Sequence, residues 1–169
     1  MTIRYTTGRL LARDLDHSDI PELQRIAGRN DVARMLFSAK SPWPRDEVQD
    51  WIDNSYWTGK AGFRLGLCLK DDPYHVVGAI GLGGDPVSCA FFIDPVHWNK
   101  GYATEAMKGL LSVASNELGL SEVEADHFHD NPASRRVLIK LGFCEIGTGL
   151  GTSAAREEAE PVVIYAKEI

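Results

Sequence analysis

A short turn followed by a helix start is the segment of this sequence best suited to bind a ligand. Residues 97 to 106 read HWNKGYATEA, and the helical spacing of apolar residues begins just beyond Gly101. The first N–H groups of a helix have no partner inside it, and that end carries partial positive charge. Such an end binds anions, phosphates above all, and Gly101 lets a ligand approach the backbone closely. The segment therefore predicts a backbone site for a phosphate-bearing ligand.

The turn does not match the common nucleotide-binding sequences. The chain has no G-x-x-x-x-G-K-[ST], and no G-x-G-x-x-G between a strand and a helix. The glycines of GAIGLGG (78–84) end a strand, and those of GTGLGT (147–152) enter a polar loop without helical spacing. We therefore expect neither glycine run to hold a phosphate.

A second polar segment, DHFHDNPAS at residues 126–134, contains groups that can move protons. A histidine titrates near neutral pH, so His127 is a candidate general base, although a lone histidine in a strand is more often structural. Transfer of the proton through ordered water is the alternative. His127, His129 and the nearby aspartates also resemble part of a metal site. Because no further ligand cluster is visible in the sequence, we expect no metal.

The elements that position these segments follow from the periods of apolar residues. In the first half of the chain, residues 9–15 alternate as a strand, residues 20–28 have helical spacing, and Pro44 opens a second helix with acidic residues in its first turn. Three strands separated by short turns follow, at residues 62–70, 75–82 and 87–94. These strands predict an antiparallel meander.

The second half contains the longest helical pattern, residues 103–118, with Gly119 as its stop. A second helix spans residues 131–142, with Asn131 as the cap and Pro132 in its first turn. Strands are expected at residues 121–129, 143–147 and 161–169, with a polar loop at residues 147–160. The chain therefore predicts an α/β (α+β) fold with a mixed, mostly antiparallel sheet of about seven strands and about four flanking helices.

Composition limits the classes of protein. A chain of 169 residues with 44% hydrophobic residues fits one domain, 1–169. A net charge of -6 disfavours nucleic acid and favours cationic partners. No segment approaches the ~18 apolar residues of a membrane span, and the N-terminus lacks the apolar run of a signal peptide. Three scattered cysteines, Cys68, Cys89 and Cys144, indicate buried reduced thiols in a cytoplasmic protein.

Two segments together resemble a known family. IDPVHWNKGYATEAMKGLL (93–111), followed after one strand by NPASRRVLIKLGF (131–143), is similar to the GNAT superfamily of acyl-coenzyme A N-acyltransferases. The branch it most resembles is that of the ribosomal-protein-alanine N-acetyltransferases. Similarity extends to TGRLLARDLDHSDIPEL and SPWPRDEVQDWI, so that it covers nearly the whole chain. Together these motifs are highly specific.

The resemblance implies a site for acetyl-coenzyme A, which is the acyl donor and co-substrate. The family's turn (Q/R)-x-x-G-x-(G/A) binds the pyrophosphate of coenzyme A through backbone amides. Main-chain groups of Phe92 and Ile93 on the fourth strand pair with pantetheine in the family, and Arg135 could meet a coenzyme A phosphate. The turn corresponds to Trp98, Asn99, Lys100, Gly101, Tyr102 and Ala103, and Thr104 opens the helix. Trp98 replaces the usual Gln or Arg.

The same resemblance implies catalytic residues. Asn131 and Ser134 match the family's N-x-x-S pattern, in which the asparagine contacts pantetheine and the serine hydroxyl lies near the sulfur. Both residues also fit a plain structural role as helix cap and capping-box serine. Many relatives have a tyrosine later in this helix and a glutamate near the start of the fourth strand. Here those positions are Leu138 and Ser88, so Ser134 is the candidate acid and His127 a candidate base.

These observations predict an acetyl-coenzyme A-dependent N-acetyltransferase in which a primary amine attacks the thioester directly. The acceptor is a protein or peptide N-terminus, with a small amine such as an aminoglycoside or polyamine as the alternative. A coenzyme A-binding sensor without catalysis is a further alternative, because the tyrosine and glutamate are missing. The protein is expected to be a monomer or homodimer.

The resemblance also implies where the acceptor lies. Acidic residues near two tryptophans, in the segment WPRDEVQDW (43–51), predict a groove that attracts a cationic amine beside aromatic surface. The segments MLFSAKSPWPRDE (35–47) and GTSAAREEAE (151–160) are expected to form the acceptor pocket.

Overall fold

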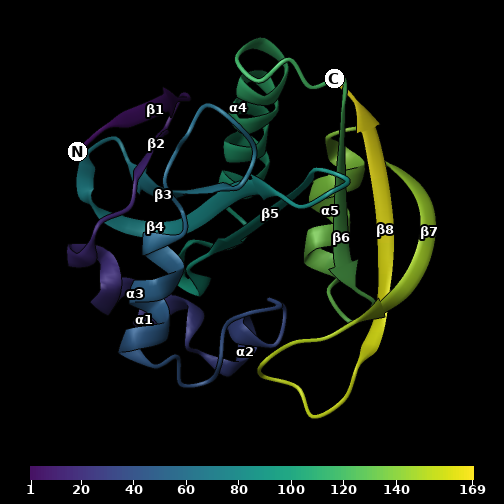
Figure 1. Cartoon of the computed structure of the whole chain (residues 1–169), viewed down its shortest axis with the longest axis horizontal. Coiled ribbons are helices and arrows are strands. Elements are labelled where there is room, and N and C mark those ends of the chain that lie inside the picture. The colour runs from purple at the N-terminus through teal and green to yellow at the C-terminus, as the bar shows by residue number, and fades with distance from the viewer.

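An eight-stranded sheet runs through the computed structural model, which describes residues 1–169 (Figure 1). The strand order is β1-β2-β3-β4-β5-β6-β8-β7, and all neighbours are antiparallel except β5 and β6. The strands are β1 (Ile3–Thr6), β2 (Leu10–Asp14), β3 (Phe63–Leu69), β4 (Asp72–Gly83), β5 (Ser88–Ile93), β6 (Glu122–Phe128), β7 (Cys144–Gly151) and β8 (Glu160–Glu168).

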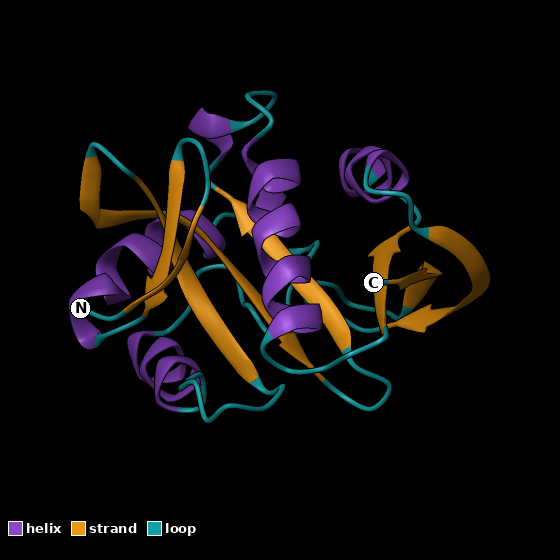
Figure 2. Ribbon diagram, turned by 90° about the horizontal axis from the view of Figure 1, so that it is seen from above, coloured by secondary structure: helices purple, strands orange, loops and turns teal.

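The helices cover both faces of this sheet. They are α1 (Ile20–Ala27), α2 (Asn30–Ala33), α3 (Arg45–Asp53), α4 (Tyr102–Asn116) and α5 (Pro132–Lys140). One buried cluster joins α4 and α5 to one face, and a second joins α1, α2 and α3 to the other. Figure 2 shows α4 lying along the central strands, with α5 set beside the part of the sheet formed by β6, β7 and β8.

The parallel pair β5 and β6 separates soon after it forms. Only Ser88 with Glu124 and Cys89 with Ala125 are paired, although β5 continues to Ile93 and β6 to Phe128. Figure 1 shows the two strands diverging from this point. We call residues 90–93 and 126–128 the splayed ends. Because backbone groups on their facing edges have no strand partner, an extended ligand could hydrogen-bond to them.

The predicted architecture is confirmed, and the differences lie in short or irregular elements. The strand β1 and the single-turn helix α2 were not predicted, because four residues give too little pattern. The strand β7 continues to Gly151, where a loop was expected from residue 147, and β4 begins at Asp72, where a turn was expected. The cap Asn131 and the positive φ of Gly119 agree with the predicted helix boundaries.

The cysteines differ from the expectation in one place. Cys68 and Cys89 are buried, and burial raises the pKa of Cys68 to about 11 and that of Cys89 to about 12. Cys144 is exposed on β7, so the prediction of three buried thiols is wrong for this residue. No helix has both the length and the apolar character needed to span a bilayer.

Candidate active site

The loop between β5 and α4 presents a row of free backbone N–H groups. None of the N–H groups of residues 99–104 donates a hydrogen bond within the protein, and the first bonded amide is that of Glu105, which donates to the Gly101 carbonyl at 3.1 Å. Asn99 and Gly101 have positive φ angles of 59° and 80°, a backbone shape that glycine and asparagine tolerate best. The Gly101 N-cap has no side chain that could satisfy these donors. The loop therefore presents free backbone donors of the kind that suit an anion.

Side chains on both flanks hold this loop to the end of β5. The Trp98 indole Nε1 donates to the Ile93 carbonyl at 2.7 Å. The Asp94 carboxylate accepts a hydrogen bond from the Val96 N–H at 3.2 Å and also pairs with Arg25. In this structure the Trp98 side chain fixes the loop, while the backbone that follows it remains free. Replacement of the family's Gln or Arg by Trp98 therefore leaves the amides available.

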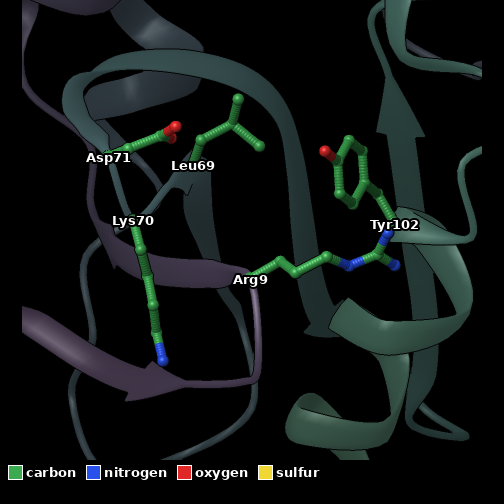
Figure 3. Close-up of a pocket in the computed structure, with 5 residues that line it drawn as sticks. All are labelled: Arg9, Leu69, Lys70, Asp71 and Tyr102. Carbon is green, nitrogen blue, oxygen red and sulfur yellow. The ribbon is translucent and has the colours of Figure 1, made fainter.

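Arg9, in the turn that connects β1 to β2, supports the loop from the opposite side. Its Nη1 donates to the Lys100 carbonyl at 2.9 Å, and its Nε donates to Glu105 at 2.7 Å. The guanidinium carbon also lies 4.5 Å from the centre of the Tyr102 ring. Figure 3 shows the two side chains next to each other. Burial acts to raise the pKa of Glu105, but hydrogen bonds from Thr7 and Arg9 outweigh it and lower the pKa. Sequence reasoning missed Arg9, because its partners lie about ninety residues away along the chain.

A pocket of about 310 Å³ lies beside this contact. It is lined by Arg9, Leu69, Lys70, Asp71 and Tyr102 (Figure 3). Figure 3 shows the Arg9 side chain extending across the pocket to Tyr102 at the start of α4. This arrangement makes Arg9 a positioning residue for the loop.

Removal of the Arg9 side chain should weaken ligand binding at the loop without unfolding the protein. Arg9→Ala deletes the hydrogen bond that orients the Lys100 carbonyl, and we expect the affinity for coenzyme A to fall about three-fold to ten-fold by calorimetry. Stability should change little, because half of the Arg9 side chain is exposed. Arg4→Ala, which breaks an arginine–aspartate pair in the same hairpin, is the control. Equal affinities for wild type and Arg9→Ala would remove Arg9 from the site.

The remaining predicted loop residues follow a gradient of burial. Asn99, Lys100 and Gly101 are exposed, Tyr102 and Ala103 are half-buried, and Thr104 is 9% exposed. The Lys100 side chain lies near His97, with 3.4 Å between Nζ and Nδ1. Arg135 is exposed on α5, where the structure gives it no protein partner.

Asn131 and Ser134 meet at the start of α5. The Asn131 side chain accepts a hydrogen bond from the Ser134 N–H at 3.2 Å and donates from Nδ2 to the Ser134 Oγ at 3.1 Å. Asn131 is therefore the helix cap and also orients the serine. Because Ser134 Oγ accepts the amide hydrogen, its own O–H remains free to donate elsewhere. Leu138, where many relatives have a tyrosine, is 1% exposed and belongs to the core.

The backbone at the splayed end of β5 differs from the prediction by one residue. The Asp94 N–H donates to the Val77 carbonyl, and antiparallel hydrogen bonding alternates, so Phe92 also turns its N–H and C=O toward β4. Phe91 and Ile93 turn theirs toward β6, although the Ile93 carbonyl is already bonded to Trp98. Phe92 therefore turns its backbone groups away from the splay, and Phe91 and Ile93 are the residues that present theirs to it.

His127 and Asp126 lie on opposite faces of β6. His127 is 5% exposed, with Nδ1 2.8 Å from the Phe128 carbonyl and Nε2 3.3 Å from the Tyr165 hydroxyl. Its ring also stacks on Tyr165, with 5.5 Å between ring centres. Asp126, two places beyond the paired Glu124, points to the face that carries α1, α2 and α3. His127 is thus bonded into the core, whereas Asp126 is half-buried beside the splayed ends.

The face that carries α1, α2 and α3 has aromatic residues on both sides of the splayed ends. Phe92 of β5 lies 6.4 Å from Trp51, and Phe128 of β6 lies 5.6 Å from Phe37, both measured between ring centres. Trp43, Phe128 and Phe92 are only 3%, 1% and 9% exposed, so the accessible aromatic surface comes from the half-buried Trp51 and the exposed Phe37. The predicted acidic residues Asp46 and Asp50 are exposed, and Glu47 pairs with Lys40.

The two segments expected to form the acceptor pocket do meet. The Ser153 hydroxyl donates to the Ala33 carbonyl at 3.2 Å, and the Ala154 N–H donates to the Phe37 carbonyl at 3.0 Å. Arg156 donates to the Arg34 carbonyl at 2.7 Å. Figure 1 shows this loop, between β7 and β8, reaching the region of α2. It therefore encloses one side of the aromatic face.

Comparison with known proteins assigns the family. Residues 9–144 match the model for the acetyltransferase (GNAT) domain. The uncharacterized N-acetyltransferase YjdG of Bacillus subtilis is 36% identical over 139 residues, covering 74% of this chain and 82% of that protein. The uncharacterized N-acetyltransferase YoaA of the same organism is 27% identical over 148 residues, covering 83% and 82%. The chain belongs to the GNAT acetyltransferase family, and it is an N-acetyltransferase.

Solved structures share the fold. A GNAT-family acetyltransferase from Bacillus anthracis superposes with a TM-score of 0.81 at 21% identity, covering 99% of this chain and 98% of that one. The ribosomal L7/L12 α-N-protein acetyltransferase RimL, in complex with coenzyme A, gives a TM-score of 0.80 at 16% identity with coverages of 99% and 98%. The self-immunity acetyltransferase MccE, in complex with acetyl-coenzyme A and AMP, gives 0.77 at 14% identity with coverages of 96% and 93%.

Proposed function

We propose that this protein transfers the acetyl group of acetyl-coenzyme A to a primary amine by direct attack. The observation that carries the proposal is the row of free N–H groups at residues 99–104, which leads directly to the splayed ends of β5 and β6. These amides fit a pyrophosphate, and the backbone of Phe91 and Ile93 fits an extended pantetheine chain. A cytoplasmic location and a monomeric or homodimeric state belong to the same proposal.

The reaction needs two proton transfers. The amine nitrogen bonds to the acetyl carbon, the carbon–sulfur bond breaks, one proton leaves the amine and one reaches the sulfur. Ser134 is suited to donate a hydrogen bond to the departing sulfur, because its hydroxyl hydrogen is free and Asn131 fixes its oxygen, and a proton from water then completes the thiol. No covalent bond to the enzyme is required.

Loss of the Ser134 hydroxyl should affect turnover more than donor binding. A hydrogen bond to the departing sulfur forms mainly in the transition state, so Ser134→Ala should lower kcat roughly ten-fold to a thousand-fold. The affinity for coenzyme A should remain within a few-fold of wild type. Steady-state assays under conditions where chemistry limits the rate would show this. An unchanged kcat would return Ser134 to a purely structural role in capping α5.

Asp126 is the residue we propose for accepting the proton from the amine. His127 is fully engaged by Phe128 and Tyr165, whereas the Asp126 carboxylate faces the aromatic side of the splayed ends. Burial raises the pKa of Asp126, with Glu124 adding to the rise and His127 opposing it. A raised pKa makes the carboxylate a stronger base than an ordinary aspartate. Asp126 therefore replaces His127 as the candidate base.

The proposed acceptor is the free N-terminus of a peptide or protein. Support comes from the half-buried Trp51 and the exposed Phe37, which lie on the two sides of the splayed ends, and from the name of RimL, a ribosomal L7/L12 α-N-protein acetyltransferase. The second candidate is a small amine, such as an aminoglycoside or polyamine, and its support is that MccE, which shares the fold, is in complex with the small molecule AMP.

A direct competition would distinguish these acceptors. A short peptide with a free N-terminus, its N-blocked twin and a polyamine are offered together with acetyl-coenzyme A, and the products are identified by mass spectrometry. The proposal expects acetylation of the free peptide alone. Acetylation of the polyamine alone would favour the small-molecule alternative. Binding of acetyl-coenzyme A without transfer to any amine would favour the sensor.

A further inference from the structure

Arg64 on β3 is a half-buried cation without a carboxylate partner. No charged group contributes to its pKa, which burial lowers. The other arginines pair with carboxylates (Arg4, Arg9, Arg13, Arg25, Arg29, Arg34 and Arg156) or are exposed (Arg45, Arg135 and Arg136). A partly desolvated guanidinium without a counter-ion is costly, so it points to a partner outside the chain.

Most of the Arg64 hydrogen-bond capacity is unused. Its Nη1 donates to the carbonyls of Trp51 and Asn54 and to the Ser55 hydroxyl at 3.4 to 3.5 Å, at the weak limit for such bonds. These contacts support the end of α3, yet they engage only one of the three nitrogens. No buried polar side-chain atom in the structure lacks a partner, so Nε and Nη2 must have access to solvent.

The position of Arg64 links it to the acceptor side of the splayed ends. Arg64 pairs with Gly81 across β4, and Gly81 pairs with Ala90 of β5, so the three residues form one row on one face. A Cβ at Gly81 would lie 3.0 Å from the Arg64 Cγ, which shows that the arginine side chain runs over this glycine. Ala90 is exposed although its strand is central, so the row is open.

The row leads from Arg64 to the proposed proton acceptor. Ser88 of β5 pairs with Glu124 of β6. Ala90 lies two residues beyond Ser88, and Asp126 lies two residues beyond Glu124, so Ala90 and Asp126 lie on the same face across the splay. Strands lie about 4.8 Å apart, so the Cα atoms of Arg64 and Ala90 are separated by roughly 10 Å, and the long arginine side chain covers part of that distance. The centre of the Trp51 ring lies 4.8 Å from the guanidinium carbon of Arg64, so the ring orients the guanidinium plane.

We infer that Arg64 binds a carboxylate of the acceptor, so that the preferred acceptor carries an acidic group close to its reactive amine. A planar guanidinium with two free nitrogens matches a carboxylate through paired hydrogen bonds. The reactive amine of the acceptor then lies beside Asp126 and the splayed ends, while its carboxylate contacts the Arg64 guanidinium. This inference rests on the proposed acetyl transfer and narrows the class of substrate.

The test compares acceptors that differ only in charge. Peptides with a free N-terminus carry Glu, Gln or Lys at the second or third position, and lysine is compared with cadaverine, which lacks its carboxylate. Wild type should favour the Glu peptide over the Gln and Lys peptides, and lysine over cadaverine, by roughly ten-fold to a hundred-fold in kcat/KM. Arg64→Ala should remove the preference, Arg64→Lys should retain part of it, and Arg64→Glu should favour the Lys peptide over the Glu peptide.

Two controls separate this role from a structural one. Arg29→Ala removes the same charge from an exposed position just before α2 and should leave the preference intact. Coenzyme A affinity should be equal in all variants, because Arg64 does not contact the loop at residues 99–104. Equal use of all acceptors by wild type, or a uniform loss with Arg64→Ala, would overturn the inference while acetyl transfer stands. Failure of wild type to acetylate any amine would overturn the proposed function and the inference with it.

Discussion

A Gly101→Glu protein should fold normally and bind coenzyme A about a thousand-fold more weakly than wild type. The substitution places a carboxylate among the free N–H groups of residues 99–104, where the pyrophosphate is proposed to lie, and like charges placed together cost several kcal/mol. A side chain at a φ of 80° is also strained, at a cost of about 1–2 kcal/mol. The new Cβ meets only the Arg9 Nη2, at 3.5 Å, so the core is not disturbed.

Calorimetry with coenzyme A measures this effect, and Gly101→Ala is the matched control. Alanine introduces the same backbone strain without the charge, so its loss of affinity should be much smaller. The two proteins should have similar circular dichroism spectra and melting temperatures. Tight coenzyme A binding by a folded Gly101→Glu protein would show that the donor lies elsewhere.

Asp126→Asn should lower turnover roughly a hundred-fold or more while making the protein more stable at neutral pH. The loss of turnover follows from removal of the proposed proton acceptor. The gain in stability follows from linkage: burial raises the pKa of Asp126 in the folded state, so ionisation of this carboxylate costs stability as the pH rises through that pKa. Asparagine has no charge to bury.

The pH dependence makes this second prediction specific. The stability difference between Asp126→Asn and wild type should be present at pH 7 and should disappear below the pKa of an unfolded aspartate, about 3.9. Melting temperatures over a pH series measure it. His127→Gln is the comparison, because it retains a hydrogen-bonding side chain in the core and should keep most of the turnover. If His127→Gln folds and its turnover falls roughly a hundred-fold or more, His127 is the base instead of Asp126.

The parts of the site that the sequence predicts are local in the chain. The loop at residues 99–104 is defined by Gly101 and the helix that follows it, and the pair Asn131 and Ser134 is defined by one helix start. Each depends on neighbours within a few residues, so spacing and residue type are sufficient. The structure shows each as an intact local unit.

The parts that could not be predicted depend on strand register and on distant contacts. The choice between Phe91 and Phe92 depends on which side of β5 their backbone groups face, and the choice between Asp126 and His127 depends on which face of β6 they occupy. A shift of one residue exchanges these directions. Arg9 and Arg64 have roles only because remote residues, Lys100 and Trp51, lie beside them. Periodicity in one segment does not contain that information.

The secondary structure also divides into elements that the sequence predicts and elements that it does not. Long periodic segments such as α4 and the meander of β3, β4 and β5 were predicted, whereas β1, α2 and the extension of β7 were not. The extension of β7 from Gly147 to Gly151 has three glycines and is held by its pairing with β8. Pairing with a partner strand overrides the weak strand preference of glycine.

A crystal structure of the protein with coenzyme A would locate the donor and its sulfur. We expect the pyrophosphate at the amides of residues 99–104, the pantetheine chain between the splayed ends of β5 and β6 beside Phe91 and Ile93, and the sulfur next to the Ser134 hydroxyl. Coenzyme A bound away from these amides, or with its sulfur remote from Ser134 and Asp126, would contradict this expectation.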